Sequence, residues 1–314
     1  MRPLLAFVLV LAGCTSQPSA PTPVPTRSPI GLPSFAQLSA AGGTAVWALV
    51  AGTHLFRSLD RGDTWVERSL PPGLANIEVS FADDTIGVLL SAGSPASSCQ
   101  TQTAAIWKTV DAAISWQQVS GAGIADPMCK RGLASGGSSR AFFTAYGPNS
   151  GPVIYRTLDI GQTWTAAKPL PDPPGFKFTT PGGIVILPGL PHVFGLVVLV
   201  EAHGYGEQQR YIFRSTDGGA TFTYASTVPS TEGSVAIVDA GRWLVIVPSG
   251  ESKQTIDGGA TWQTYKTDYS QAAPTAPDVV FGHPDIGYAT VRGSIQRTLD
   301  GGAHWATIKT PGTE

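Results

Sequence analysis

Apolar residues along this chain gather in short runs bounded by Gly, Ser, Pro or Asp. Runs at 77–84, 86–93 and 104–111 follow one another, and the same arrangement returns between 278 and 309. Short runs rich in β-branched and aromatic residues and separated by turn-forming residues predict β-strands. No helical period of useful length competes with them. The pattern therefore predicts an all-β fold.

A short motif recurs six times between these runs. It consists of Ser or Thr, any residue, Asp, any residue, Gly, any residue, Thr and an aromatic residue, and box four reads RSTDGGATF from Arg214. The box aspartates are Asp60, Asp111, Asp159, Asp217, Asp257 and Asp300, separated by 51, 48, 58, 40 and 43 positions. Periods of about 40–50 residues with short strands are typical of the four-stranded blades of a β-propeller.

The spacing also predicts the number of blades. The 26 residues between Pro33 and Asp60, together with the 14 that follow Asp300, amount to about one more blade, so a ring of six is expected. A seventh blade is the alternative, but it would have to be degenerate and fit into too little chain. The longest interval must contain an insertion, with segments 168–183 and 201–210 as its irregular parts.

Each box is expected at the turn between the third and fourth strands of its blade. Gly there permits positive φ, Asp accepts hydrogen bonds from nearby amides, and the closing Trp or Phe packs onto the hairpin. The motif resembles the Asp-box (BNR) repeat of sialidases, sortilin-type receptors, some endoglucanases and photosystem II assembly factors. That resemblance implies a propeller whose ligand site lies opposite the boxes, so all six box aspartates are interpreted as structural.

Two boxes depart from the motif, and a basic residue recurs in most of them. Box two has Ala113 in place of Gly and box six has His304 in place of Thr, so both turns should be weaker and His304 should be exposed. The position three before the aspartate is basic in five boxes and Gln254 in the other. We expect these long side chains to pack along the neighbouring blade; a positive ring for an anionic partner is the alternative.

The N-terminus predicts export. Residues 1–13 have one early Arg, an apolar run and Gly13, which is the pattern of a signal peptide. Leu11-Ala12-Gly13-Cys14 resembles a bacterial lipobox, which implies lipidation of Cys14 and anchoring to a membrane in the cell envelope. Ordinary secretion with an incidental cysteine is the alternative. Residues 14–33, rich in Pro, Ser and Thr, are expected to form a tether before the propeller of 34–314.

The two remaining cysteines suggest a disulfide. Cys99 and Cys129 form an even pair in an exported chain, and both are expected in loops of neighbouring blades on the face opposite the boxes. Two free thiols are the alternative. Neither cysteine belongs to a CxxC or a His-rich cluster, so no metal site is expected.

Composition and motifs exclude several functions. A formal net charge of -2 gives no electrostatic basis for binding nucleic acid. The sequence contains no GxSxG, HExxH, Walker or dinucleotide-binding motif, so no cofactor is expected. His203 is the only histidine beside acids and an aromatic residue, and a polar loop residue is favoured there over a catalytic or metal-binding one.

The predicted topology places a set of charged and aromatic residues on the face opposite the boxes. They are the candidates for ligand contact: Arg131, Glu201, His203, Tyr205, Glu207, Arg210, Tyr269 and Arg292. Arg131, Arg210 and Arg292 offer the three arginines that a sialidase uses to hold a carboxylate, although the Arg-Ile-Pro motif of that family is absent.

The style of the repeat is most similar to that of photosystem II assembly (stability) factors. The resemblance implies an extracytoplasmic binding or assembly module, with no enzymatic activity implied by the motif. Together with the lipobox, it leads us to expect a lipid-anchored monomer that binds a protein or glycan partner. A sialidase-like glycoside hydrolase or a lectin is the alternative.

Overall fold

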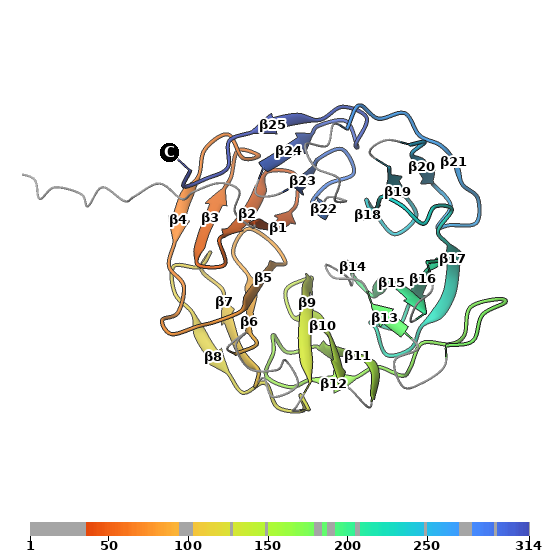
Figure 1. Ribbon diagram of the computed structural model, residues 1–314. Helices are drawn as coiled ribbons and strands as arrows, with labels where there is room; N and C mark the ends of the chain where they lie inside the picture. The colour runs from red at the N-terminus through yellow and green to blue at the C-terminus, as the bar shows by residue number, and fades with distance from the viewer. Residues whose placement is uncertain are drawn as a thin grey trace, which may run out of the picture.

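The chain folds into a ring of β-sheets around a central axis (Figure 1). The computed structural model describes residues 36–93, 103–125, 128–147, 150–178, 184–186, 192–204, 208–247, 250–269, 278–291 and 294–313. These residues form six antiparallel sheets. The prediction of an all-β, six-bladed propeller is therefore confirmed, and the seven-bladed alternative is wrong.

Each blade is built from consecutive strands. Blade one contains β1 (Ala36–Ala41), β2 (Ala45–Val50), β3 (His54–Ser58) and β4 (Val66–Arg68); blade two contains β5 (Ile77–Phe81), β6 (Gly87–Ser91), β7 (Ala105–Thr109) and β8 (Gln117–Val119); blade three contains β9 (Cys129–Gly136), β10 (Arg140–Gly147), β11 (Ser150–Thr157) and β12 (Thr165–Ala166). Blade four contains β13 (Ile184–Ile186), β14 (His192–Phe194), β15 (Val197–Gly204), β16 (Arg210–Ser215) and β17 (Thr223–Thr227); blade five contains β18 (Ser234–Ile237), β19 (Trp243–Ile246), β20 (Lys253–Thr255) and β21 (Gln263–Thr264); blade six contains β22 (Asp278–Phe281), β23 (Gly287–Val291), β24 (Ser294–Thr298) and β25 (Ala306–Ile308).

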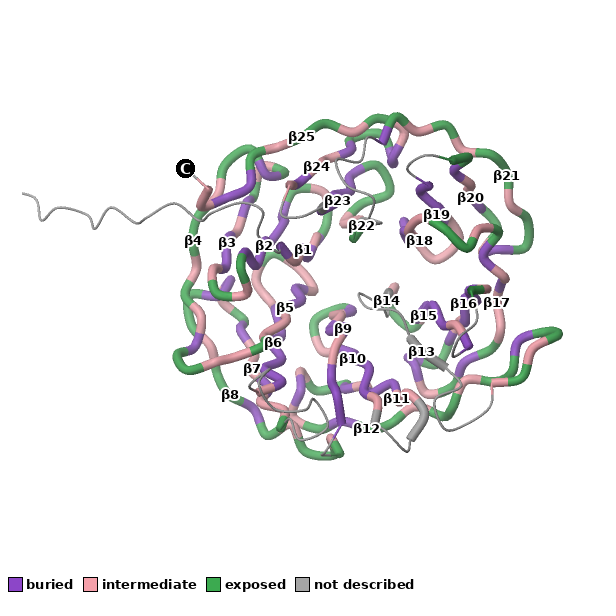
Figure 2. Tube along the Cα trace, viewed as in Figure 1, coloured by how far each residue is buried: buried purple, intermediate pink, exposed green. Residues whose placement is uncertain are grey.

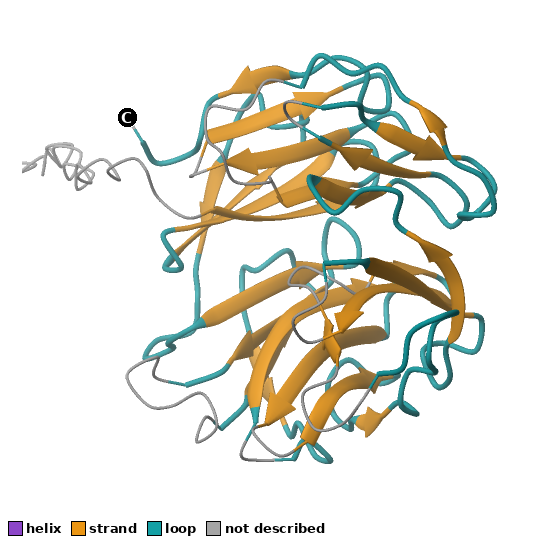
Figure 3. Cartoon of the chain, turned by 45° about the vertical axis from the view of Figure 1, so that its right-hand side comes forward, coloured by secondary structure: helices purple, strands orange, loops and turns teal. Residues whose placement is uncertain are grey.

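Within a blade, the first strand lies nearest the axis and the last lies at the perimeter (Figure 1). The same ring turned by 45° contains only strands and loops in its described part (Figure 3). No helix among the described residues is long and apolar enough to cross a membrane. The turns between third and fourth strands define one face of the ring, here called the box face.

The hydrophobic core lies between the blades. Six clusters of buried side chains each join one blade to the next, and inner strands are buried while much of the perimeter is exposed (Figure 2). In every cluster, the closing aromatic residue of a box packs against the preceding blade; these residues are Trp65, Trp116, Trp164, Phe222, Trp262 and Trp305. The repeated box therefore fixes both a turn and an interface between blades.

The ring closes by side-chain packing between blade six and blade one. Ile286, Tyr288 and Ile295 of blade six share a buried cluster with β1 and β2. At the box face, Arg297 Nη1 lies 2.7 Å from Asp63 Oδ1 and also donates to the Arg61 carbonyl at 2.8 Å. Because every described blade consists of consecutive strands, no strand is exchanged between the two ends to close the ring.

Blade four differs from the others as the long repeat interval predicts. Its innermost position is occupied by two short strands, β13 and β14, that pair with opposite ends of β15. The described part of the preceding insertion packs on this blade, where Phe178 lies 6.0 Å from the Tyr211 ring and 5.8 Å from the Phe213 ring. The insertion thus extends the core of blade four.

Candidate functional site

The box turns are held by one repeated set of hydrogen bonds. In box four, Ser215 Oγ donates to Asp217 Oδ1 at 2.7 Å and accepts the amide of Gly219 at 2.8 Å. Asp217 also accepts the amides of Ala220 and Thr221 at 2.9 and 3.0 Å and the Thr221 hydroxyl at 2.7 Å. This carboxylate therefore satisfies the turn that carries it, in agreement with a structural role.

The same contacts keep the box carboxylates charged. In Asp60 and Asp257, hydrogen bonds from the threonine four residues later, first from its hydroxyl and then from its amide, lower the pKa to about 2. Ser115 does the same for Asp111. Each box therefore presents an ionised carboxylate at neutral pH.

Box two forms the same turn without glycine. Ala112 and Ala113 adopt φ values of 63° and 59°, which strain any residue that carries a Cβ. The Ala113 amide still donates to Thr109 Oγ1 at 3.0 Å, and Asp111 still accepts the amide of Ser115 at 3.0 Å. Both alanines pack in the core between blades one and two, so buried methyl groups offset part of the strain.

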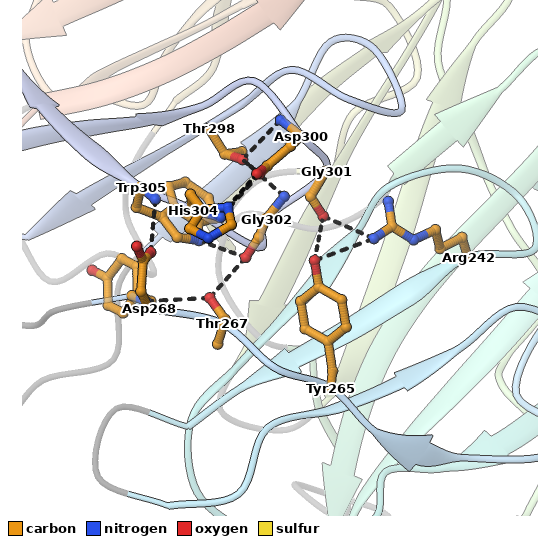
Figure 4. Close-up of polar contacts among 11 residues, drawn as sticks. Arg242, Tyr265, Thr267, Asp268, Thr298, Asp300, Gly301, Gly302, His304 and Trp305 are labelled. Atoms are coloured by element: carbon orange, nitrogen blue, oxygen red, sulfur yellow. Dashed lines mark hydrogen bonds and ion pairs between the residues drawn. The ribbon is translucent and has the colours of Figure 1, made fainter.

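Box six replaces the usual threonine by His304, whose side chain is exposed and contacts Asp300 (Figure 4). The His304 Nδ1 lies 2.5 Å from Asp300 Oδ2, where a threonine or serine hydroxyl lies in the other boxes. The hydrogen bond with Asp300, followed by the charges of Asp300 and Asp268, raises the pKa of His304. The imidazole therefore replaces a neutral hydroxyl donor by a donor that is itself charged when protonated.

Arginines connect the blades along the box face. Arg156 of blade three donates to the Gly218 carbonyl of box four at 3.4 Å, and Arg297 of blade six reaches the corresponding Arg61 carbonyl of box one. In blade one, Arg57 lies over the Trp47 ring and 3.4 Å from Asp84 of blade two. These contacts favour packing against the next blade over a ring of free positive charge.

Sequence reasoning missed Arg242, which supplies this connection from blade five. Its Nη2 donates to the Gly301 carbonyl of box six at 2.8 Å (Figure 4). Its Nη1 donates to the Pro284 carbonyl at 3.2 Å. Tyr265 donates to the same Gly301 carbonyl at 3.0 Å. The signal in the sequence was the neutral Gln254, because box five lacks the basic residue found in the other boxes.

Away from the box turns, Glu201 within β15 and Arg210 at the start of β16 form a buried pair. Their side chains are 5% and 10% exposed, and Arg210 Nη1 lies 3.2 Å from Glu201 Oε1. Burial raises the pKa of Glu201 to about 7, although the Arg210 charge opposes this shift. Arg210 also donates to the Ser230, Glu232 and Gly233 carbonyls at 2.9, 3.0 and 3.0 Å. It therefore fixes the link between blades four and five.

Two further candidate ligand residues, His203 and Tyr269, have partners within the protein. His203 is partly buried, and its Nδ1 lies 3.0 Å from the Gly204 carbonyl oxygen. Tyr269 is buried between blades five and six, with its ring 5.5 Å from that of Trp305. Burial raises the pKa of Tyr269 to about 12. Neither contact prepares a catalytic group.

Four residues named from the sequence lie outside the described residues: Tyr205, Glu207, Arg292 and Cys99. The same holds for Cys14. Cys129 begins β9 and is buried. Because Cys99 lies outside the described residues, the disulfide stays a prediction. Among the described residues, no group of three or more His, Cys, Asp or Glu side chains is arranged to hold a metal ion.

A cavity of about 560 Å³ lies between the innermost strands. It is lined by residues of β1, β5, β9, β14, β18 and β22, together with Tyr146 at the end of β10. Arg131 of β9 lies with its guanidinium 4.7 Å from the centre of the Tyr146 ring and donates to the Tyr146 hydroxyl. Among the candidate ligand residues that the structure describes, Arg131 is the one that lines this cavity.

Polar side chains in this cavity also join the inner strands to each other. Gln37 and Ser39 accept the amides of Val79 and Phe81 at 3.1 and 2.9 Å. One blade on, Glu78 accepts the amide of Leu133 at 2.7 Å, and burial raises the pKa of this carboxyl group. The free edge of an inner strand is thereby satisfied by its neighbour, which gives these groups a structural task.

The arginine arrangement of a sialidase is not assembled by the described residues. Arg131 contacts Tyr146, whereas Arg210 is committed to three backbone carbonyls and Glu201. A carboxylate clamp requires guanidinium groups that point at one ligand. The two candidate arginines that the structure describes, Arg131 and Arg210, contact different parts of the protein.

No protein-family model matches the chain, and no curated protein matches its sequence. Solved structures similar to it include the Hadza microbial sialidase Hz136, at 14% identity over 87% of this chain and 68% of that one, with a TM-score of 0.52. A protein of unknown function from Dyadobacter fermentans is 15% identical over 87% and 93% of the two chains, with a TM-score of 0.51. YCF48 bound to D1 peptide is 18% identical over 89% and 84%, with a TM-score of 0.48.

At these identities the likeness concerns the fold alone. The six antiparallel blades come from the structure of this chain. The chain is a six-bladed β-propeller whose fold is similar to that of a microbial sialidase.

Proposed function

We propose that this protein is a non-enzymatic binding or assembly module that recognises a protein or glycan partner at the face opposite the boxes. We further propose that a lipid on Cys14 holds it to a membrane of the bacterial cell envelope, outside the cytoplasm. The tether of residues 14–33 would let the propeller reach its partner while anchored.

The observation that carries the proposal is the combination of an axial cavity with side chains that already have structural partners. The cavity has about 560 Å³, and Arg131 with Tyr146 forms a cationic and aromatic pair on its wall. Glu78, Glu201 and Arg210 are held by amides, carbonyls or each other. A pocket of this kind supports recognition, since catalysis needs acids and bases aimed at a reacting bond.

Co-purification from native membranes tests the proposal. Tagged full-length protein should retain a specific partner that is lost from the Arg131→Glu variant, because the reversed charge also breaks the contact with Tyr146. Gln118→Glu, on the exposed perimeter strand β8, is the matched control and should retain the partner. Partner recovery that is equal for both variants would contradict a role for the cavity.

A parallel assay addresses catalysis. The purified protein should not release the fluorophore from a methylumbelliferyl sialoside above the rate of a heat-denatured sample. Turnover that disappears in an Arg131→Ala variant with an unchanged melting temperature would instead support the sialidase alternative.

A further inference from the structure

The exposed large apolar side chains of the described chain gather at the box turns. There are eight: Leu59, Val66, Val110, Ile114, Leu158, Leu196, Ile256 and Leu299, with exposures between 50% and 67%. Five of them occupy the position directly before a box aspartate. Ile114 also lies within box two, and Val66 directly follows the closing tryptophan of box one. Such a distribution on one face is not expected of scattered surface residues.

Box four has no aliphatic residue directly before its aspartate. It has Thr216 directly before its aspartate, and Thr216 is exposed. In this blade Leu196, from the turn between β14 and β15, lies beside the box, because its carbonyl accepts the Gly218 amide at 2.9 Å, and its side chain is exposed. Every blade therefore presents an exposed aliphatic side chain at the box face. We call Leu59, Val110, Leu158, Leu196, Ile256 and Leu299 the aliphatic ring.

The turn itself does not require these side chains. With Thr216, box four makes the same hydrogen bonds from Ser215 and Asp217 as the other boxes make with Leu, Val or Ile. Box one illustrates the match, with Ser58 Oγ 2.7 Å from both Asp60 Oδ1 and the Gly62 amide. The aliphatic ring is thus a property of the surface that folding leaves free to vary.

The charge beside the ring is mostly negative where it is exposed. Asp63, Asp84 and Asp285 have side chains 64%, 57% and 66% exposed, and a box carboxylate follows five of the six ring residues. The arginines nearby are turned into the protein: Arg57 and Arg297 are 11% and 17% exposed. Arg61 is an exposed cation in box one.

We propose that the box face docks a protein segment that combines aliphatic residues with Lys or Arg, in the manner of a basic amphipathic helix. Apolar contact with the aliphatic ring would provide the burial, and the adjacent carboxylates would pair with the basic residues. A second copy of the chain would bring the exposed carboxylates of two box faces together, and an anionic membrane surface would meet the same carboxylates. This interaction is separate from the ligand proposed at the axial cavity.

A defined probe tests this inference. The full chain with Cys14→Ser needs no detergent, and its binding to a fluorescent helical peptide of Leu and Lys is followed by anisotropy. The test variant carries Leu59→Thr, Val110→Thr, Leu158→Thr, Ile256→Thr and Leu299→Thr, each using the residue that box four has naturally. Affinity should fall by about tenfold or more, because tenfold corresponds to about the burial of one aliphatic side chain.

Two controls separate docking from a folding defect. Leu59→Ile, Leu158→Ile and Leu299→Ile keep the ring apolar and should bind the peptide as the starting protein does, whereas Thr216→Leu should bind it more tightly. A peptide in which Glu replaces every Lys should not bind. Melting temperatures of all variants verify that the propeller is intact.

The proposal is wrong if the threonine variant melts normally and binds the Leu/Lys peptide with unchanged affinity. It is also wrong if the Leu/Glu peptide binds equally well. Binding to phosphatidylglycerol vesicles that the threonine variant loses would assign the ring to a lipid surface instead, and dimerisation in sedimentation that it loses would assign the ring to a second copy.

Discussion

Two adjacent glycines in box four offer a direct test of how the box joins two blades. Gly218 and Gly219 both have positive φ, at 70° and 80°. A Cβ on Gly219 would lie 2.5 Å from Cε1 of Phe142, a fully buried residue of blade three. A Cβ on Gly218 would meet nothing closer than Leu196 Cδ2 at 3.6 Å, an ordinary contact. The two positions therefore differ in packing and share the backbone strain.

The expected magnitudes follow from these contacts. Left-handed backbone costs an L-residue roughly 1–2 kcal/mol, and replacing Gly by Ala recovers about 0.4–1 kcal/mol through the unfolded chain. Gly218→Ala should therefore cost about 1 kcal/mol. Gly219→Ala adds an overlap with Phe142, and overpacking of a core typically costs about 1–3 kcal/mol. Its total should be about 2–4 kcal/mol.

Urea unfolding followed by tryptophan fluorescence measures both variants. The midpoint should shift clearly more for Gly219→Ala than for Gly218→Ala, with equal slopes. Ala113→Gly, at the matching position of box two, is the third comparison. It should change stability by less than about 1 kcal/mol, because relief of strain and loss of a buried methyl group oppose each other. Equal midpoints for the two box-four variants would refute the packing argument.

Four further outcomes are expected. Arg242→Ala should destabilise the protein by about 1–3 kcal/mol in the same assay, because a charged donor to the Gly301 and Pro284 carbonyls is lost; no change would mean that these bonds contribute nothing. The pKa of His304 is raised in the folded state, so protonated His304 stabilises the fold below its unfolded pKa, and this stabilisation is lost as the pH rises through the folded pKa. The melting temperature of the wild type should therefore fall relative to that of His304→Thr between mildly acidic and alkaline pH. Cys14→Ser should release a folded propeller from the membrane fraction, and continued sedimentation with membranes would contradict lipid anchoring. Mass spectrometry without reduction should find one Cys99–Cys129 bridge, and two alkylatable thiols would exclude it.

The fold could be predicted because its determinants are local and repeated. Each box makes its turn with residues at most a few positions apart, as Ser215, Asp217 and Thr221 do. The spacing of the boxes then set the number of blades without any long-range information. The division of the inner strand of blade four into β13 and β14 could not be predicted from the boxes, because β14 is short and depends on pairing with β15.

The candidate site was harder to predict because burial depends on contacts between distant segments. Arg210 lies at the start of β16, and its partners are carbonyls of Ser230, Glu232 and Gly233 in the next link, which no local pattern indicates. Arg242 reaches Gly301 across 59 positions, so the neutral Gln254 signals a missing basic residue but does not indicate which residue replaces it. The aliphatic ring could be aligned from the sequence, yet its exposure and the replacement of Thr216 by Leu196 required the structure.

Site-specific photo-cross-linking at the cavity tests the proposed function most directly. A benzophenone side chain at Tyr146, beside Arg131 on the cavity wall, is compared in living cells with one at Gln118 on the outer strand β8. Our account predicts a discrete cross-linked partner from position 146 that is lost when Arg131→Glu is added, and none from position 118. The same partner captured from both positions, or capture at position 146 that does not respond to Arg131→Glu, would contradict it.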